Sequence, residues 1–380
     1  MDFTKVTAYM DSLVNEVGIP SVDMIVYQDH RELYRHMAGY KDAEKKIPLR
    51  GDETYNLYSA TKVVTTCAAM QLIEQGKMQL DDPVSMYLPA YGRLTVKDGG
   101  QVRPAQRVMT IRHLMSMQSG LNYDASQNVP SIRKVLEETG GLATTRQLVD
   151  AKAQDPLEFE PGTNFLYSLS HDVLAAVIEA ASGMKFSEYL AANIFEPLQM
   201  GTIGFSLRQR DWDRQCAQYV YNGETQKFVP MEAHDLNYRF TPAYESGGAG
   251  LISDVQDYIA FADALACGGV SVDGKRILSP QMIQLWSANQ LGPQSRKTFD
   301  AWNRKGYSYA LGVRTRVDTS VGGRGSVGEF GWDGAACAYA AIDPQTHLSI
   351  FFAMHVRNFG YAYDVIHPKL RDLVYGALAE

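Results

Sequence analysis

The sequence has few cysteines and no excess of basic residues. Its four cysteines, Cys67, Cys216, Cys267 and Cys337, lie far apart and form no C-x-x-C pair. This spacing favours reduced, mostly buried thiols over a disulfide framework, as is typical of a cytoplasmic protein. Among 380 residues, 43 are acidic and 36 are basic, so the formal net charge is -7. A protein that binds a phosphate backbone needs the opposite balance, and no nucleic-acid partner is predicted.

Long apolar runs and a leader-like start are also absent. No run approaches the roughly 18 apolar residues that a membrane helix needs. Residues 1–20 are amphipathic and do not form a charged stretch followed by an apolar core. We therefore expect no signal peptide, no membrane span and a cytoplasmic location.

The sequence has no metal-binding motif, and its one nucleotide-type glycine motif lies outside the βαβ unit that such a motif needs. The eight histidines show no H-x-H or H-E-x-x-H spacing, and the acidic residues form no metal-binding loop pattern. Residues 323–328 read G-x-G-x-x-G, but they lie late in the chain, with no βαβ unit around them. No G-x-S-x-G elbow is present, which excludes a typical α/β-hydrolase. No metal and no cofactor are predicted.

What is present is a clear pattern of helices and strands. Apolar spacing and capping residues predict helices at residues 3–17, 59–75, 111–118, 144–152, 170–182, 187–194, 253–267 and 368–379. Alternating apolar residues predict a hairpin at 21–40 and strands at 309–317, 336–342 and 348–356. Residues from about 79 to 244 carry helical and loop-like signals only.

This order predicts an α+β fold. One antiparallel sheet, built from both chain ends and flanked by helices, would satisfy it, with a mainly helical insertion. Residues 1–78 and 245–380 are expected to form the sheet domain and residues 79–244 the helical domain, with the active site between them. The sequence does not indicate an oligomeric state.

Ser59 and Lys62 form a Ser-x-x-Lys motif at the start of a predicted helix. Residues three apart lie on one helix face, and a serine hydroxyl needs a neighbouring base to act as a nucleophile. A partly desolvated lysine can be that base, and the helix N-terminus favours developing negative charge. Since Ser-x-x-Lys is expected about once by chance in such a chain, the motif needs support from other signals.

Two later segments supply that support. Tyr167 precedes a predicted helix, and a cation beside its phenol would favour the phenolate and so proton transfer; a core tyrosine is the alternative. Trp332, Asp333 and Gly334 precede an apolar strand, where the glycine would leave the backbone open to a substrate. A backbone N–H there and that of Ser59 could form an oxyanion hole; a tight turn between strands is the alternative.

Taken in order, these motifs resemble the serine β-lactamase and penicillin-binding protein superfamily. The supporting stretches are T-x-R-H-L at 110–114 with S-G-L at 119–121, F-x-P-L at 195–198 and the glycine-rich stretch 246–253. The resemblance covers nearly the whole chain. It is closest in style to class C β-lactamases, DD-peptidases and β-lactamase-fold carboxylesterases, and it implies their fold and an acyl-enzyme mechanism.

Carried over to this sequence, the resemblance assigns roles. Ser59 becomes the acylated nucleophile, Lys62 its activating partner and Tyr167 the general acid or base. The backbone N–H groups of Ser59 and Ala335 become the oxyanion hole. Which of Lys62 and Tyr167 takes the first proton stays open, because the two would titrate as a coupled pair.

Five further residues are expected to bind the substrate: Trp332, Asp333, Gly334, Leu169 and Tyr123. Leu169 stands where lactamases and peptidases of the superfamily usually carry Asn. Trp332-Asp333-Gly334 lacks the Lys and Thr that hold a substrate carboxylate. Both departures disfavour β-lactams and cell-wall peptides, and both are tolerated in the superfamily's esterases.

The function predicted from the sequence is therefore a serine hydrolase, most simply a carboxylesterase that acts on small-molecule esters. A β-lactamase, a DD-peptidase-like amide hydrolase and an acyltransferase are the alternatives of the same class. A catalytically weak binding protein that keeps the fold is the alternative of another class, because a fold does not fix a function.

Overall fold

An antiparallel sheet forms the centre of the protein. The computed structural model describes residues 1–124, 128–231 and 240–379. Within them, the main sheet has eight strands in the order β10-β11-β12-β13-β14-β1-β2-β3. These strands are β1 (Ser21–Gln28), β2 (Arg31–Asp42), β3 (Ile47–Pro48), β10 (Tyr307–Tyr309), β11 (Arg314–Arg316), β12 (Phe330–Gly331), β13 (Tyr339–Asp343) and β14 (Leu348–Ala353).

Shorter strands and the helices complete the fold. The shorter strands are β4 (Thr54–Asn56), β5 (Thr95–Asp98), β6 (Gln101–Pro104), β7 (Tyr219–Asn222), β8 (Lys227–Pro230), β9 (Ile252–Asp254) and β15 (Val356–Arg357). The helices are α1 (Thr4–Asn15), α2 (Thr61–Glu74), α3 (Ile111–Met115), α4 (Pro130–Glu138), α5 (Thr145–Lys152), α6 (Ser170–Ser182), α7 (Phe186–Leu190), α8 (Val255–Ala266), α9 (Pro280–Ser287), α10 (Pro293–Asp300) and α11 (His367–Ala379).

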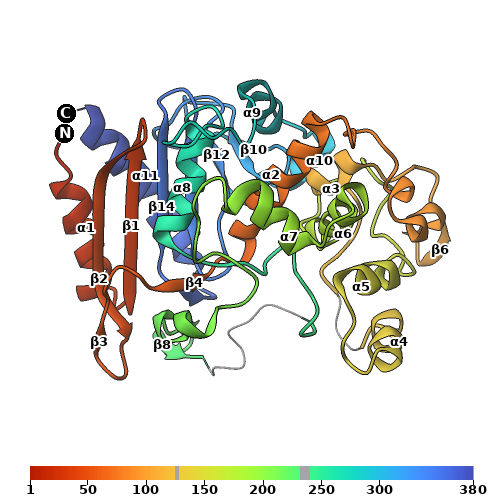
Figure 1. Cartoon of the computed structure of the whole chain (residues 1–380), viewed down its shortest axis with the longest axis horizontal. Helices are drawn as coiled ribbons and strands as arrows, with labels where there is room; N and C mark the ends of the chain where they lie inside the picture. Colours follow the sequence, from red (N-terminus) through yellow and green to blue (C-terminus); the bar gives the residue numbers. More distant parts are fainter. Residues whose placement is uncertain (125–127, 232–239, 380) are drawn as a thin grey trace.

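The two chain ends meet where β1 pairs with β14. Ile25 of β1 lies opposite Phe351 of β14 in the antiparallel register. Successive side chains of a strand point to opposite faces, so Met24 packs in the cluster with α1 and α11, and Ile25 packs in the cluster with α8. Figure 1 shows α1 and α11 at one end of the molecule with the two termini beside each other. The predicted α+β fold, with one sheet from both chain ends, is confirmed.

Helix α2 connects this sheet to the helical part of the chain. All its residues from Thr61 to Leu72 are buried, and it contacts α6. Helix α6 has the predicted bounds and ends at Gly183, whose φ of 72° is the left-handed C-cap that glycine favours. Figure 1 shows α4, α5 and α6 at the end of the molecule opposite the termini.

Several elements differ from the sequence predictions. The strand predicted at 309–317 is the hairpin of β10 and β11, because Gly312 turns the chain with a φ of 73°. A Cβ at Gly312 would lie 2.2 Å from Thr66 Oγ1, so the turn packs tightly on α2. The helix predicted at 253–267 begins two residues later, at Val255, with Asp254 as its cap: the Asp254 carboxylate accepts the Asp257 N–H at 2.8 Å.

Other elements were not predicted at all. Hairpins β5–β6 and β7–β8 lie in the region expected to be helical, and α4, α9 and α10 were also missed. Each of these three helices has a proline in its first turn, where the missing N–H costs nothing. The boundaries proposed for the two domains, after residues 78 and 244, stay a prediction. In the part of the chain described here, no helix is both long and apolar enough to cross a membrane.

Candidate active site

Ser59 lies at the start of α2, after a strained turn. Strand β4 pairs with β9, and the Leu57 N–H donates to the Leu251 carbonyl at 2.9 Å, which fixes the segment before Ser59. Tyr58 then has a φ of 45°, a left-handed conformation that is uncommon for non-glycine residues and clusters at functional sites. Its buried phenol is hydrogen-bonded with the Gln218 side chain. This turn presents Ser59 at the N-terminal end of the helix.

Lys62 is fully buried, and its ammonium group contacts three oxygen atoms. Lys62 Nζ donates to Ser59 Oγ at 3.1 Å and to Tyr123 Oη at 3.1 Å. It also donates to the Gly248 carbonyl at 2.7 Å. Since an ammonium group has three donors, all three have an acceptor here. The side chain is therefore held in one orientation, with one donor on Ser59.

Tyr167 lies among aromatic rings next to Lys62. Lys62 Nζ is 4.6 Å from the centre of the Tyr167 ring, which is a cation–π distance. The Trp332 indole N–H donates to Tyr167 Oη at 2.7 Å and so stabilises negative charge on that oxygen. The ring centre of Tyr167 is 5.4 Å from that of Trp302 and 5.6 Å from that of Tyr123. The structure thus brings Ser59, Lys62, Tyr123, Tyr167 and Trp332 together.

The backbone at Gly334 and Ala335 approaches the segment that precedes Ser59. A Cβ on Gly334 would lie 2.3 Å from the Leu57 carbonyl oxygen, so only glycine allows this approach. Ala335 is exposed, and among the described residues no backbone acceptor takes its N–H. The Ala335 N–H is thus placed near the Ser59 segment and available to a bound molecule.

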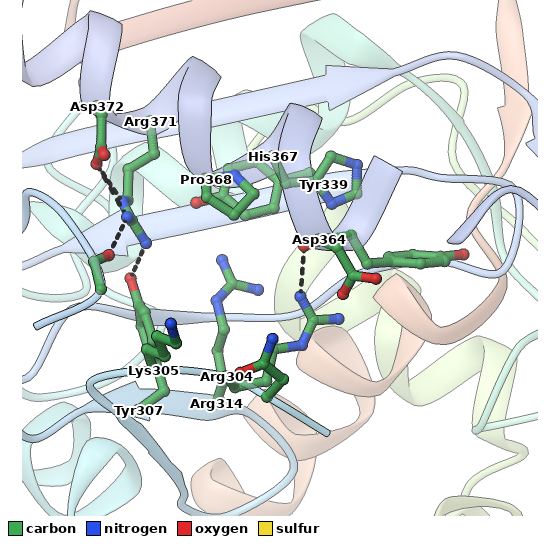
Figure 2. A pocket seen from close by; sticks show the side chains of 13 residues that line it. Arg304, Lys305, Tyr307, Arg314, Tyr339, Asp364, His367, Pro368, Arg371 and Asp372 are labelled. Atoms are coloured by element: carbon green, nitrogen blue, oxygen red, sulfur yellow. Dashed lines mark hydrogen bonds and ion pairs between the residues drawn. The ribbon is translucent and has the colours of Figure 1, made fainter. Parts of the chain in front are cut away.

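Asp333 does not lie with these residues. Its carboxylate accepts from Arg314 at 3.0 Å and from Arg304 at 2.9 Å, and the His367 ring lies 3.7 Å away. Burial raises the pKa of Asp333, but the two guanidinium groups outweigh it and hold the pKa below its usual value. Figure 2 shows Arg304, Arg314 and His367 in the wall of a pocket of about 240 Å³ beside α11. That Asp333 binds a substrate stays a prediction; in the structure its carboxylate is bound by two guanidinium groups.

Leu169 packs in the protein interior. It lies just before α6 and is buried in a small apolar cluster with Ile132, Leu148 and Tyr244. A contact between Leu169 and a substrate stays a prediction. Tyr123 is partly exposed and contacts Lys62 directly, and its predicted contact with a substrate stays a prediction.

Sequence reasoning missed two buried residues beside Lys62. His171 and Asp172 open α6, and both interact electrostatically with Lys62. Burial holds the pKa of His171 well below its usual value, and Lys62 adds to this, so the imidazole is neutral. Burial raises the pKa of Asp172 above its usual value, and hydrogen bonds and Lys62 offset only part of that effect. The available signals were the acidic residue in the first turn of a predicted helix and the glycine-rich stretch that contains Gly248.

Comparison with known proteins decides the family. A family model described as Beta-lactamase matches residues 6–372. The chain belongs to the β-lactamase family. The resemblance to the serine β-lactamase and penicillin-binding protein superfamily is thereby confirmed.

Relatives of this β-lactamase-family chain include hydrolases and acyltransferases. It is 30% identical over 280 residues to Esterase EstB of Burkholderia gladioli, covering 69% of each chain. It is 26% identical over 395 residues to Acyltransferase calJ of Penicillium decumbens, covering 94% of this chain and 90% of that one. Among solved structures, EstCE1, a hydrolase with promiscuous acyltransferase activity, matches with a TM-score of 0.81 and 26% identity over 98% of both chains.

Proposed function

We propose that this protein is a carboxylesterase that hydrolyses small esters through an acyl-enzyme on Ser59. The observation that carries the proposal is the contact of Lys62 Nζ with Ser59 Oγ at 3.1 Å, made while the same ammonium group lies over the Tyr167 ring. A serine hydroxyl becomes a nucleophile when a partner takes its proton. The likeness to Esterase EstB, at 30% identity, supports the choice of esters.

The proposed reaction assigns one step to each group. The coupled pair of Lys62 and Tyr167 takes the proton of Ser59 Oγ as this oxygen attacks the ester carbonyl. The backbone N–H groups of Ser59 and Ala335 stabilise the oxyanion of the tetrahedral intermediate. The same pair then returns the proton to the leaving alcohol. Water attacks the acyl-enzyme by the reverse sequence, releasing the acid and restoring Ser59.

Two observations favour esters over β-lactams. No lysine or threonine stands in the Trp332–Gly334 segment, and the cations nearest to Asp333 are already bound to that carboxylate. The Leu169 side chain is buried in apolar surroundings and offers no amide to a substrate. Acyl transfer to an alcohol instead of water is the second candidate, because EstCE1 is described as a hydrolase with promiscuous acyltransferase activity and calJ as an acyltransferase, each at 26% identity.

The test uses an ester, a penicillin and two serine variants. The purified protein is incubated with p-nitrophenyl butyrate and with a fluorescent penicillin, and adducts are located by mass spectrometry. We expect ester turnover that is lost in Ser59→Ala by a factor of about 10³ or more. The matched control Ser320→Ala removes an exposed serine hydroxyl and should keep full activity.

Other outcomes select the alternatives. A stable penicillin adduct on Ser59 without ester turnover favours the penicillin-binding alternative. Faster product formation when a primary alcohol is added, with the new ester as product, favours acyl transfer. No turnover and no adduct with either reagent contradicts the proposal and favours the binding protein.

A further inference from the structure

Asp172 is a buried carboxylate close to the ammonium group of Lys62. Its side chain lies in the first turn of α6 and is 1% exposed. Oδ1 accepts from Tyr244 Oη at 2.8 Å and from Ser246 Oγ at 2.6 Å. Within the described part of the chain, Oδ2 has no hydrogen-bond partner of normal geometry, although the Gly248 backbone lies close enough to stabilise its charge. A carboxylate in such a place is costly unless a positive group balances its charge.

The position of Gly248 shows which positive group Oδ2 faces. A Cβ built on Gly248 would lie 2.5 Å from Asp172 Oδ2 and 3.5 Å from Lys62 Nζ. The two charged atoms are therefore within about 6 Å, the range in which opposite charges stabilise each other. The N-terminus of α6 also favours a negative charge in its first turn. Both effects favour the ionised form of Asp172 while Lys62 is charged, and they oppose the burial that raises its pKa.

A second connection runs through the glycine-rich turn. Ser246 Oγ donates to Asp172 and accepts the Ala249 N–H at 3.0 Å, which fixes the turn around Gly248. The carbonyl of Gly248 then accepts from Lys62 at 2.7 Å. Thr65 of α2 donates to the neighbouring Gly247 carbonyl at 2.6 Å and holds the same turn from the other side.

We propose that Asp172 is a positioning residue that keeps Lys62 in its ammonium form and in contact with Ser59. This inference rests on the proposed function, because it concerns the reaction of Ser59. A lysine that stays charged stabilises the anion that forms on Ser59 or Tyr167 and does not itself accept the serine proton. Tyr167 is then the group that takes the proton.

Few other titratable groups face this pair. Tyr123 and Tyr167 contact Lys62, and Tyr244 contacts Asp172. His171 is neutral and hydrogen-bonds with Thr66 Oγ1 at 3.2 Å. Within the described residues, Asp172 is thus the carboxylate that the Gly248 turn brings to Lys62, and its removal should change how activity depends on pH.

The test compares Asp172→Asn with the wild type and with Asp257→Asn. Asn keeps the volume and an acceptor but removes the charge. We expect kcat/KM for p-nitrophenyl butyrate to fall about tenfold or more with little change in KM. The alkaline limb of the pH–rate profile should move to lower pH by about one to two units, because the ammonium loses its counter-charge. Asp257, in the first turn of α8, binds two backbone N–H groups away from the site and is the matched control.

The outcomes are distinguishable. An unchanged pH profile in Asp172→Asn, or the same change in Asp257→Asn, overturns the inference. If Asp172→Asn does not fold, the double variant Tyr244→Phe with Ser246→Ala removes both donors and makes the carboxylate easier to protonate. Its acid limb should then move to higher pH, and an unmoved limb contradicts the inference. A wild type without ester turnover contradicts the proposed function instead.

Discussion

Trp332 has one polar atom, the indole nitrogen, and this atom forms a hydrogen bond with Tyr167. Its indole N–H reaches Tyr167 Oη at 2.7 Å, and its ring packs beside Tyr167 and Tyr309. A lysine in place of Trp332 could also donate a hydrogen bond to Tyr167 Oη, but its charge would then be buried among these aromatic rings. The indole therefore provides a donor and an apolar wall from one side chain.

The substitution Trp332→Phe separates these two contributions. Phe keeps most of the apolar contact but removes the N–H, so we expect kcat to fall about tenfold while KM changes little. The matched control is Trp286→Phe, whose buried N–H donates to the Leu311 carbonyl at 2.8 Å. The control should lose stability and keep its kinetic constants. Steady-state kinetics and thermal melts measure both, and equal kcat in Trp332→Phe and the wild type would show that the bond has no part in the reaction.

At the scale of elements, the Trp332–Ala335 segment is placed by its contact with the turn before α2. Gly334 approaches Leu57 closely, and we infer that this approach sets the distance between the Ala335 and Ser59 N–H groups. This distance decides whether both can reach one oxyanion.

The substitution Gly334→Ala tests this placement. The new methyl group would lie 2.3 Å from the Leu57 carbonyl oxygen and push the segments apart. We expect kcat/KM to fall about a hundredfold, the typical effect of losing one oxyanion donor. Gly360→Ala, where no atom lies within 4 Å of the added Cβ, is the control and should behave like the wild type. A Gly334→Ala protein that is folded and fully active would contradict the assigned oxyanion hole.

Elements with local signals could be predicted from the sequence, and those set by distant contacts could not. Helix α6 has its own cap glycine, and α5 has a capping box between Thr144 and Gln147. The β1–β2 hairpin has its own alternation of apolar and polar residues. By contrast, the Gly312 turn exists because α2 and His171 occupy the space beside it, and nothing near residue 312 in the sequence shows that.

The candidate site divides in the same way. Ser59, Lys62 and Tyr167 could be found because motif order survives in the sequence. The face of the strand on which the Asp333 side chain lies could not be predicted from the sequence. It depends on Arg304 and Arg314, which lie on the side of the sheet near α11. Asp172 was missed because its partner Ser246 is far away in the chain. The predicted cytoplasmic location is untested and stays a prediction.

At the scale of the whole molecule, the Asp333 ion pairs join three parts of the fold. Arg304 follows α10, Arg314 is in β11, and His367 begins α11. Arg314 is almost completely buried, and its nearer counter-charge is Asp333 at 3.0 Å, with Glu329 at 3.9 Å. The stability of the molecule should therefore depend on the ionisation of Asp333.

The substitution Asp333→Asn measures that dependence. Removing one partner of a buried pair should lower the free energy of unfolding by about 3 kcal/mol at pH 7. The folded pKa of Asp333 lies below its unfolded value, so the contribution is complete above about pH 4 and is lost as pH falls through the folded pKa. Urea unfolding across this pH range should show the two proteins converging in acid.

The control is Asp98→Asn, which breaks an exposed pair with Arg103 and should cost little at any pH. A difference between Asp333→Asn and the wild type that stays constant down to pH 3 would show that packing, not charge, is responsible.

The pairing of β1 with β14 also sets an order of events during synthesis. Ile25 is synthesised more than 300 residues before its partner Phe351. At about 5–20 residues per second, the β1–β2 hairpin waits for roughly tens of seconds with one edge unpaired. An open strand edge is a template for pairing with other chains. A nascent chain or a fragment that stops before residue 348 lacks β14, and we expect it to associate through the open edge of β1 more readily than a chain that includes β14.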